Sequence, residues 1–173
     1  FNKYNTDLHI RFKQQNNSYS VQRDLGQPAT CLSEWKLNGE VNFEGNNPAW
    51  DDEAGGVQID VLDDQGKVIA RITNEMTYKN NNKFPAYIKI NGKPVVTMIR
   101  EQLNTVTDKH QPFFMTVNSN GVSFTYGKYQ AVNAARFDTA ANWRKPKTVR
   151  ILFTVNPNNN YDRAVDINKL SFE

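Results

Sequence analysis

Hydrophobic and polar residues alternate along most of this chain with the period of two that is typical of half-buried β-strands. The clearest example is the stretch 55–73, GGVQIDVLDDQGKVIARIT. The residues at its centre, Asp63–Gly66, have the polar and positive-φ chemistry of a tight turn. The stretch therefore predicts a β-hairpin. The aliphatic residues expected to share one side of each strand are Val57, Ile59, Val61, Val68, Ala70 and Ile72.

Similar alternation predicts strands along the rest of the chain. The expected strands are 7–13, 35–43, 86–90, 95–99, 113–117, 122–126, 149–155 and 165–172. Asn91-Gly92 and the segment 118–121 are hairpin signals. We expect loops over 14–29, 44–54, 74–83, 100–111 and 127–146, with a helical turn possible within 131–143. Nine or ten short strands indicate an all-β fold, an antiparallel two-sheet β-sandwich or jelly roll.

The length of 173 residues is sufficient for one domain with a full two-sheet core, and no linker or repeat divides it. The chain begins at Phe1, with no initiating Met and no signal peptide. We therefore expect residues 1–173 to be a single module excised from a larger protein. The lone Cys31 excludes an internal disulfide, which fits synthesis in a reducing cytosol.

The charge is nearly balanced, with 21 Lys and Arg against 18 Asp and Glu, a net charge of +3. This is too little charge, too evenly spread, for a nucleic-acid-binding surface. The basic cluster Arg144–Lys147 is expected to be a solvated turn. No apolar run approaches the length of a membrane span, so we expect no membrane insertion.

The sequence holds no motif for catalysis or metal binding. His9 and His110 have no partners at ligand spacing, which excludes a structural zinc site. The acidic turns Asp51–Glu53 and Asp63–Asp64 offer oxygen ligands, but without the ordered spacing of a calcium loop. We expect these acids to be solvated, with a structural calcium as the alternative. No cofactor is expected, and the chain is not expected to be an enzyme.

The loops instead hold the side chains that bind neutral sugars: aromatic rings that stack on a sugar, and planar polar groups that pair with its hydroxyls. Trp50 and Trp143 have two interpretations. Each ring either stacks on a sugar or plugs the open end of the sandwich. Arg71 lies across from Asp60 on the same side of the hairpin and either pairs with it or joins a polar binding surface. Trp35 and Tyr126 are expected in the core, and Tyr78 and Tyr129 are expected to be exposed. The candidate ligand-binding residues are Trp50, Asn47, Asp51, Trp143, Tyr78, Tyr129 and Arg71.

The order of these elements resembles a known group of modules. The segments VQIDVLDDQGKVIARI, YIKINGKPV, VSFTYGKY, KTVRILF and AVDINKLSF look like the concanavalin-like or galectin-like jelly rolls inserted in siphophage tail proteins. In particular they resemble a carbohydrate-binding module of an evolved distal tail protein. The resemblance implies a module at the virion tail tip that attaches to cell-wall or surface polysaccharide. It also implies contacts with other tail subunits, and no reaction.

Two alternatives remain open. In the first alternative, the module is a structural or protein-docking β-sandwich of a tail or fibre and has no sugar ligand. In the second it is a polysaccharide lyase similar to alginate lyases. Gln58-Ile59-Asp60 and the segment 126–130 resemble strands of that family, but Asp60 stands where the family has His. The family's Arg-x-Glu-Leu strand is missing.

Overall fold

The computed structural model describes most of the chain. Its backbone is described over residues 8–12, 18–26, 30–41, 56–76, 83–101, 111–135, 140–154 and 163–173. Side chains are described over 20–26, 30–41, 58–73, 88–95, 111–130, 140–152, 167 and 169–173.

The described residues form twelve β-strands and no helix. The strands are β1 (Leu8–Phe12), β2 (Ser18–Asp24), β3 (Glu34–Val41), β4 (Gly56–Asp63), β5 (Val68–Met76), β6 (Lys83–Ile90), β7 (Lys93–Glu101), β8 (Gln111–Asn118), β9 (Gly121–Tyr126), β10 (Tyr129–Ala135), β11 (Pro146–Thr154) and β12 (Arg163–Phe172). None of the described residues belongs to a helix that could cross a membrane.

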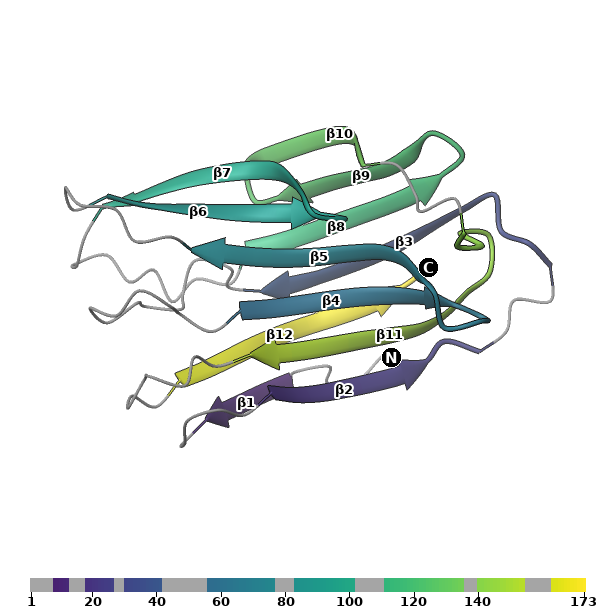
Figure 1. The fold of residues 1–173 in the computed structure, drawn as a ribbon, viewed down its shortest axis with the longest axis horizontal. Helices are drawn as coiled ribbons and strands as arrows, with labels where there is room; N and C mark the ends of the chain where they lie inside the picture. Colours follow the sequence, from purple (N-terminus) through teal and green to yellow (C-terminus); the bar gives the residue numbers. More distant parts are fainter. Residues whose placement is uncertain are drawn as a thin grey trace.

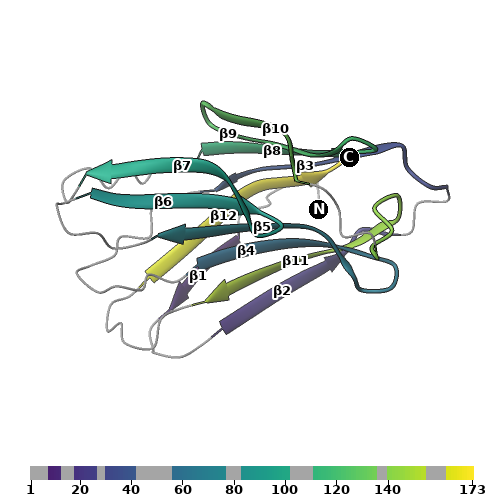
Figure 2. The same cartoon turned by 45° about the horizontal axis from the view of Figure 1, so that its top comes forward.

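These strands make two six-stranded sheets that pack face to face (Figures 1 and 2). Sheet A has the order β1-β12-β3-β8-β9-β10, and sheet B has the order β2-β11-β4-β5-β6-β7. All neighbouring strands are antiparallel. The edge strands β7 and β10 lie side by side, which brings the two sheets together along one edge. The predicted all-β, two-sheet sandwich is confirmed.

The core lies between the sheets and is built from alternate residues of both inner faces. In β3, Trp35, Leu37 and Val41 are buried while Lys36 is exposed. Sheet B contributes the inward-facing aliphatic residues Ile59, Val61, Ala70, Ile72, Ile88, Ile90, Val149 and Ile151. The alternation seen in the sequence is therefore the alternation of inner and outer faces, and the predicted core positions of Trp35 and Tyr126 are confirmed.

The predicted hairpins are also confirmed. β4 and β5 pair across a turn in which Gly66 has a φ of 78°. β6 and β7 meet at Asn91 and Gly92, whose φ values of 50° and 80° match a two-residue type I′ turn. β8 and β9 pair from Phe113 opposite Tyr126 to Asn118 opposite Gly121. In each case the turn residues accept the left-handed backbone that closes a twisted hairpin.

Two predicted loops contain strands, and those predictions were wrong. The range 14–29 holds β2, which pairs with β11 at the edge of sheet B. Its side chains from Ser20 to Asp24 are all exposed, so no hydrophobic alternation marks it. The range 127–146 holds β10, the edge strand of sheet A, so residues 131–135 of the possible helical turn are extended, while 136–139 lie outside the described residues. Its alanines favour a helix locally, but hydrogen bonding to β9 decides the conformation.

Strands also extend into stretches predicted to be polar loops. β5 continues to Met76, β6 begins at Lys83, and β7 ends at Glu101. Pairing with a neighbouring strand supplies hydrogen bonds regardless of side-chain polarity, so a strand can outlast its hydrophobic pattern.

Candidate functional site

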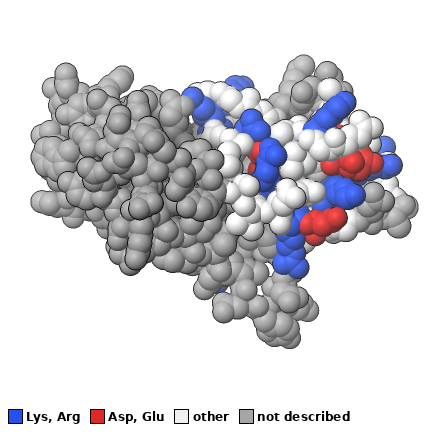
Figure 3. Space-filling view, turned by 60° about the horizontal axis from the view of Figure 1, so that its bottom comes forward, with Lys and Arg blue, Asp and Glu red and all other residues white. Residues whose placement is uncertain are grey.

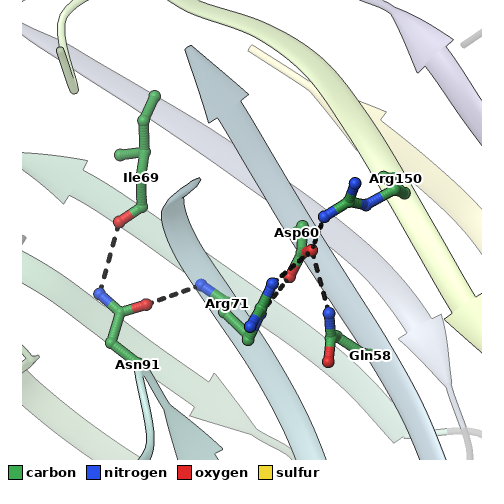
Figure 4. A network of polar contacts seen from close by, with 6 residues as sticks. All are labelled: Gln58, Asp60, Ile69, Arg71, Asn91 and Arg150. Carbon is green, nitrogen blue, oxygen red and sulfur yellow. Dashed lines mark hydrogen bonds and ion pairs between the residues drawn. The ribbon is translucent and has the colours of Figure 1, made fainter. Parts of the chain in front are cut away.

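The outer face of sheet B carries a charged network at its centre (Figure 4). Strand register places Arg150 of β11 opposite Asp60 of β4, and Asp60 opposite Arg71 of β5. Arg71 donates from Nε to Asp60 Oδ1 at 2.7 Å and from Nη2 to Oδ2 at 3.0 Å. Arg150 donates from Nη2 to Oδ2 at 2.6 Å. The predicted cross-strand pair of Asp60 and Arg71 is confirmed, and Arg150 is a third member that the sequence did not indicate.

This network keeps a buried carboxylate ionised. The Asp60 side chain is 1% exposed, whereas those of Arg71 and Arg150 are 38% and 35% exposed. Burial acts to raise the pKa of Asp60, but the hydrogen bonds from Arg71 and Arg150 outweigh it and hold the pKa below its usual value. The hydrogen bonds to Asp60 in turn raise the pKa of Arg71. Asp60 is therefore a fixed anion around which two guanidinium groups are positioned.

Two amide side chains complete the network. Gln58 donates from Nε2 to Asp60 Oδ2 at 3.0 Å. Asn91, in the β6–β7 turn, accepts from the Arg71 backbone N–H at 2.8 Å and donates to the Ile69 carbonyl oxygen at 3.4 Å. The turn thus fixes the backbone of β5 at Arg71.

On one face of the molecule, the described residues carry more basic than acidic side chains. Figure 3 shows one face on which Lys and Arg side chains are spread widely, with fewer Asp and Glu side chains between them. The network itself has two guanidinium groups and one carboxylate.

The outer face of sheet A has a different character. Phe114 points outward from the central strand β8 and is 50% exposed, while its neighbour Phe113 is buried in the core. Register aligns Asn38, Phe114, Thr125 and Gln130 across four strands. We call these four residues the Phe114 row. The side chains of Asn38, Thr125 and Gln130 make no hydrogen bond within the described structure. An exposed ring therefore lies among polar groups whose hydrogen-bonding capacity is unused, an arrangement that sequence analysis did not single out.

One end of the sandwich is closed by the segment 140–145. Asp63 accepts backbone N–H groups of Gln65 and Lys67 at Oδ1 and of Asn142 at Oδ2. Burial acts to raise the pKa of Asp63, but these three hydrogen bonds together lower it. Asp63 is 2% exposed, so its prediction as a solvated turn acid was wrong. The backbone N–H groups that converge on it from a distant segment hold the carboxylate inside.

The predicted ligand-binding residues are not brought together among the described residues. Trp50, Asn47, Asp51 and Tyr78 lie outside the described part of the chain, so their roles stay predictions. Arg71 belongs to the network on sheet B.

Trp143 and Tyr129 both pack against the core. Trp143 is half-buried and packs against the core cluster, which favours the interpretation of its ring as a plug. Its backbone carbonyl oxygen also accepts a hydrogen bond from Trp35 Nε1. Tyr129 is also half-buried, and Lys128 Nζ lies 5.5 Å from its ring centroid. The prediction that Tyr129 is exposed was therefore wrong, because the β9–β10 turn draws the ring onto the core.

Among the described residues, no group of three or more His, Cys, Asp or Glu side chains lies close enough to hold a metal ion. Asp63, proposed as a calcium ligand, has both oxygens bonded to backbone N–H groups. The other predicted acidic turn, Asp51–Glu53, lies outside the described residues.

The two segments that resemble alginate lyases do not meet. Gln58 and Asp60 lie on the outer face of sheet B. The segment 126–130 lies in sheet A, where Tyr126 is buried and Gln130 is exposed beside Thr125. Outer faces of two packed sheets point away from each other, so these residues form no common cleft.

No protein-family model matches the chain, and no curated protein sequence matches it. Several solved structures are similar in fold. A mutant of alginate lyase Aly36B, in complex with an alginate tetrasaccharide, aligns at 12% identity over 96% of this chain and 80% of that chain, with a TM-score of 0.54. The CBM2 module of the evolved Dit of Lactobacillus casei BL23 phage J-1 aligns at 10% identity over 87% and 69%, with a TM-score of 0.50.

A tetrameric galectin from the ball sponge Cinachyrella sp. aligns at 9% identity over 91% of this chain and 98% of that chain. Its TM-score is 0.45, so this likeness adds nothing to the fold argument. The two stronger likenesses show a β-sandwich that is shared by an enzyme and by a phage module. Because one fold hosts both, the function has to be argued from the side chains.

Proposed function

We propose that this chain is a non-catalytic carbohydrate-binding module of a bacteriophage tail protein. It attaches the virion to polysaccharide of the host cell wall or cell surface. It acts at the tail tip as one module of a larger distal tail protein, and neighbouring tail subunits are its protein partners. The fold shared with the phage J-1 module supports this proposal.

The observation that carries the proposal is the Phe114 row. An aromatic ring that is half exposed on a central strand presents a flat apolar surface to the C–H face of a sugar. The amides of Asn38 and Gln130 can each donate to and accept from sugar hydroxyls. The sheet ladder fixes the backbone of both residues, so their amides emerge beside the ring from defined positions. The sequence predicted such groups in loops, and we propose this sheet face as the sugar site.

Catalysis is not proposed because the one buried acid of the sheet B network is poorly suited to move protons. The lowered pKa of Asp60 makes it a weak base, and its oxygens are occupied by Gln58, Arg71 and Arg150. A folded preparation that released unsaturated sugars from acidic polysaccharides would instead support the lyase alternative.

The proposal is tested by binding of a fluorescent fusion of the chain to a panel of intact lactic acid bacteria and to polysaccharide purified from their walls. We expect labelling of some strains, and we expect purified polysaccharide to compete with it. Phe114→Ala should reduce the labelling at least tenfold, while Phe114→Trp should retain it, because the indole preserves the stacking surface.

Val21→Ala is the matched control, since Val21 is the other large hydrophobic residue that is exposed in the described structure, at 42%, and it lies on sheet B. The control should bind as the original chain does. If Phe114→Ala also binds normally, the Phe114 row is not the sugar site. If the folded fusion labels no strain and no polysaccharide, the structural or protein-docking alternative replaces the proposal.

A further inference from the structure

The network on sheet B has more positive charge than its position requires. One buried carboxylate, Asp60, is paired with two arginines that are each about one-third exposed. A single Asp–Arg pair already satisfies both charges, and the second arginine leaves an excess of one positive charge. Partial burial reduces solvent screening, so this excess charge attracts an anion more strongly than a fully solvated arginine does.

The arginines also retain unused donors. Arg71 contacts Asp60 through Nε and Nη2, and Arg150 contacts it through Nη2 alone. Within the described structure, Nη1 of Arg71 and both Nη1 and Nε of Arg150 have no hydrogen-bond partner. Asp60 holds one edge of the Arg71 guanidinium through two hydrogen bonds and anchors Arg150 through one nitrogen (Figure 4), so both groups are restrained beside each other before any ligand arrives.

Most neighbouring positions on this face carry no acid that would offset this charge. Register places Gln22 next to Arg150, and it places Thr73 and then Lys89 in line with Gln58 on the adjoining strands. Among the described side chains of these two rows, Asp60 is the sole acid, and its oxygens are already bonded. The row on the other side holds one further acid, Asp24 opposite Thr148, whose Oδ1 accepts the backbone N–H of Gly26. The site is therefore complementary to a small oxyanion.

We propose that Arg71 and Arg150, held by Asp60 on the outer face of sheet B, bind the anionic group of an acidic glycan. The group is an oxyanion, either the carboxylate of a uronic acid or a phosphate that links or decorates the sugars. A planar guanidinium pair matches the two oxygens of either group. The net charge of only +3 on the whole chain argues against nucleic acid as the ligand. This site stands apart from the Phe114 row, which lies on the other sheet.

The test compares the binding of four soluble polymers by calorimetry at low ionic strength: polygalacturonate, poly(glycerol phosphate), neutral dextran and single-stranded DNA. We expect one of the two acidic polymers to bind, which identifies the oxyanion, and we expect added salt to weaken this binding. Arg150→Gln should weaken it at least tenfold, because Gln keeps a planar donor but removes the charge. Any binding of dextran should be the same for this variant as for the original chain.

Lys36→Gln is the control for charge alone, since Lys36 is an exposed cation on the outer face of sheet A. It should leave binding of the acidic polymer unchanged. The proposal is overturned if neither acidic polymer binds, if Arg150→Gln binds normally, if Lys36→Gln weakens binding equally, or if DNA binds as tightly as the acidic glycan. If the bacterial labelling proved independent of Phe114, the proposed sugar site on sheet A would fail, but the anion site on sheet B would be unaffected.

A second measurement, the thermal unfolding midpoint with added small anions, uses only the original chain and so does not depend on the folding of a variant. Free glucuronate or inorganic phosphate should raise the thermal unfolding midpoint of the original chain at concentrations too low for the general stabilising effect of phosphate salts. Glucose, and chloride at the same ionic strength, should not raise it to the same extent. Equal midpoints with the oxyanions and with chloride would contradict the site.

Discussion

The indole Nε1 of Trp35 donates a 2.7 Å hydrogen bond to the backbone carbonyl oxygen of Trp143, which lies 108 residues further along the chain. Trp35 is 1% exposed within the core, and its ring centroid lies 5.6 Å from that of Phe172. The segment that carries Trp143 is also bonded to Asp63 through Asn142. The two tryptophans therefore connect the core of sheet A to the segment that closes one end of the sandwich.

Trp143→Ala should destabilise the fold without abolishing glycan binding. Full burial of a Trp gives a loss of about 3–5 kcal/mol, and because Trp143 is only half-buried we expect about 2–3 kcal/mol. Urea unfolding followed by circular dichroism measures this difference. Lost polysaccharide binding by a fully folded Trp143→Ala protein would show that the ring is a binding platform and not a plug.

Phe113 and Phe114 are adjacent in sequence but should respond in opposite ways to truncation. Phe113 is fully buried and stacks near Phe124, so Phe113→Ala should cost about 3–5 kcal/mol of unfolding free energy. Phe114→Ala should cost less than about 1 kcal/mol, because half of the ring is already in water. If urea unfolding showed the same loss of unfolding free energy for Phe113→Ala and Phe114→Ala, the Phe114 ring would be covered in solution.

Gly39→Ala should overpack the core beside Phe113. A Cβ at position 39 would lie 2.8 Å from Phe113 Cε1 and 3.2 Å from Leu170 Cδ1. Because Phe113 is fully buried, its ring has no solvent to move into, and we expect a loss of about 1–3 kcal/mol.

The matched measurement is a double-mutant cycle with Phe113→Leu, which removes the clashing ring atoms. Gly39→Ala should cost less in the Phe113→Leu background than in the original chain. An additive cycle would indicate that the loss at position 39 comes from the strand backbone.

Stability should fall in acid, with Asp60 and Asp63 as major contributors. Both carboxyls have folded-state pKa values below the ordinary Asp value of 3.8, which is the value expected in the unfolded chain. Their contribution is therefore complete above the unfolded value and is lost as pH falls through the folded values. Urea midpoints measured from neutral pH to pH of about 2 should trace this loss.

Asp60→Asn isolates one part of the acid effect. At neutral pH the variant should unfold with a free energy about 2–3 kcal/mol lower than that of the original chain. Breaking a fully buried ion pair costs about 3–5 kcal/mol, and we expect less here because both arginines are partly solvated. The curves of the variant and the original chain should converge in acid. A constant difference down to low pH would show that the charge of Asp60 contributes nothing.

Much of the architecture follows from local pattern. The alternation of Trp35, Leu37 and Val41 placed β3 correctly, and Asn91-Gly92 predicted its hairpin, because side-chain period and turn conformation are properties of adjacent residues. The edge strands β2 and β10 were not predicted. An edge strand pairs with only one neighbour, and its sequence shows little hydrophobic alternation.

The candidate sites depended more on distant contacts. The pairing of Asp60 with Arg71 was predictable, since both belong to one hairpin whose register the turn sets. Arg150 joins them from β11, 90 residues beyond Asp60 in the chain, and only sheet order brings it there. Phe114 is exposed and Asp63 is buried for the same reason, since exposure depends on which elements cover a position.

The sequence by itself thus determined the fold class, the hairpins and the inner face of most strands, because these depend on side-chain period and turn chemistry. Only the tertiary structure decided which strands lie at the edges, which second arginine joins Asp60, and which aromatic rings meet solvent. Those features arise from contacts between segments far apart in the chain, and no local pattern encodes them.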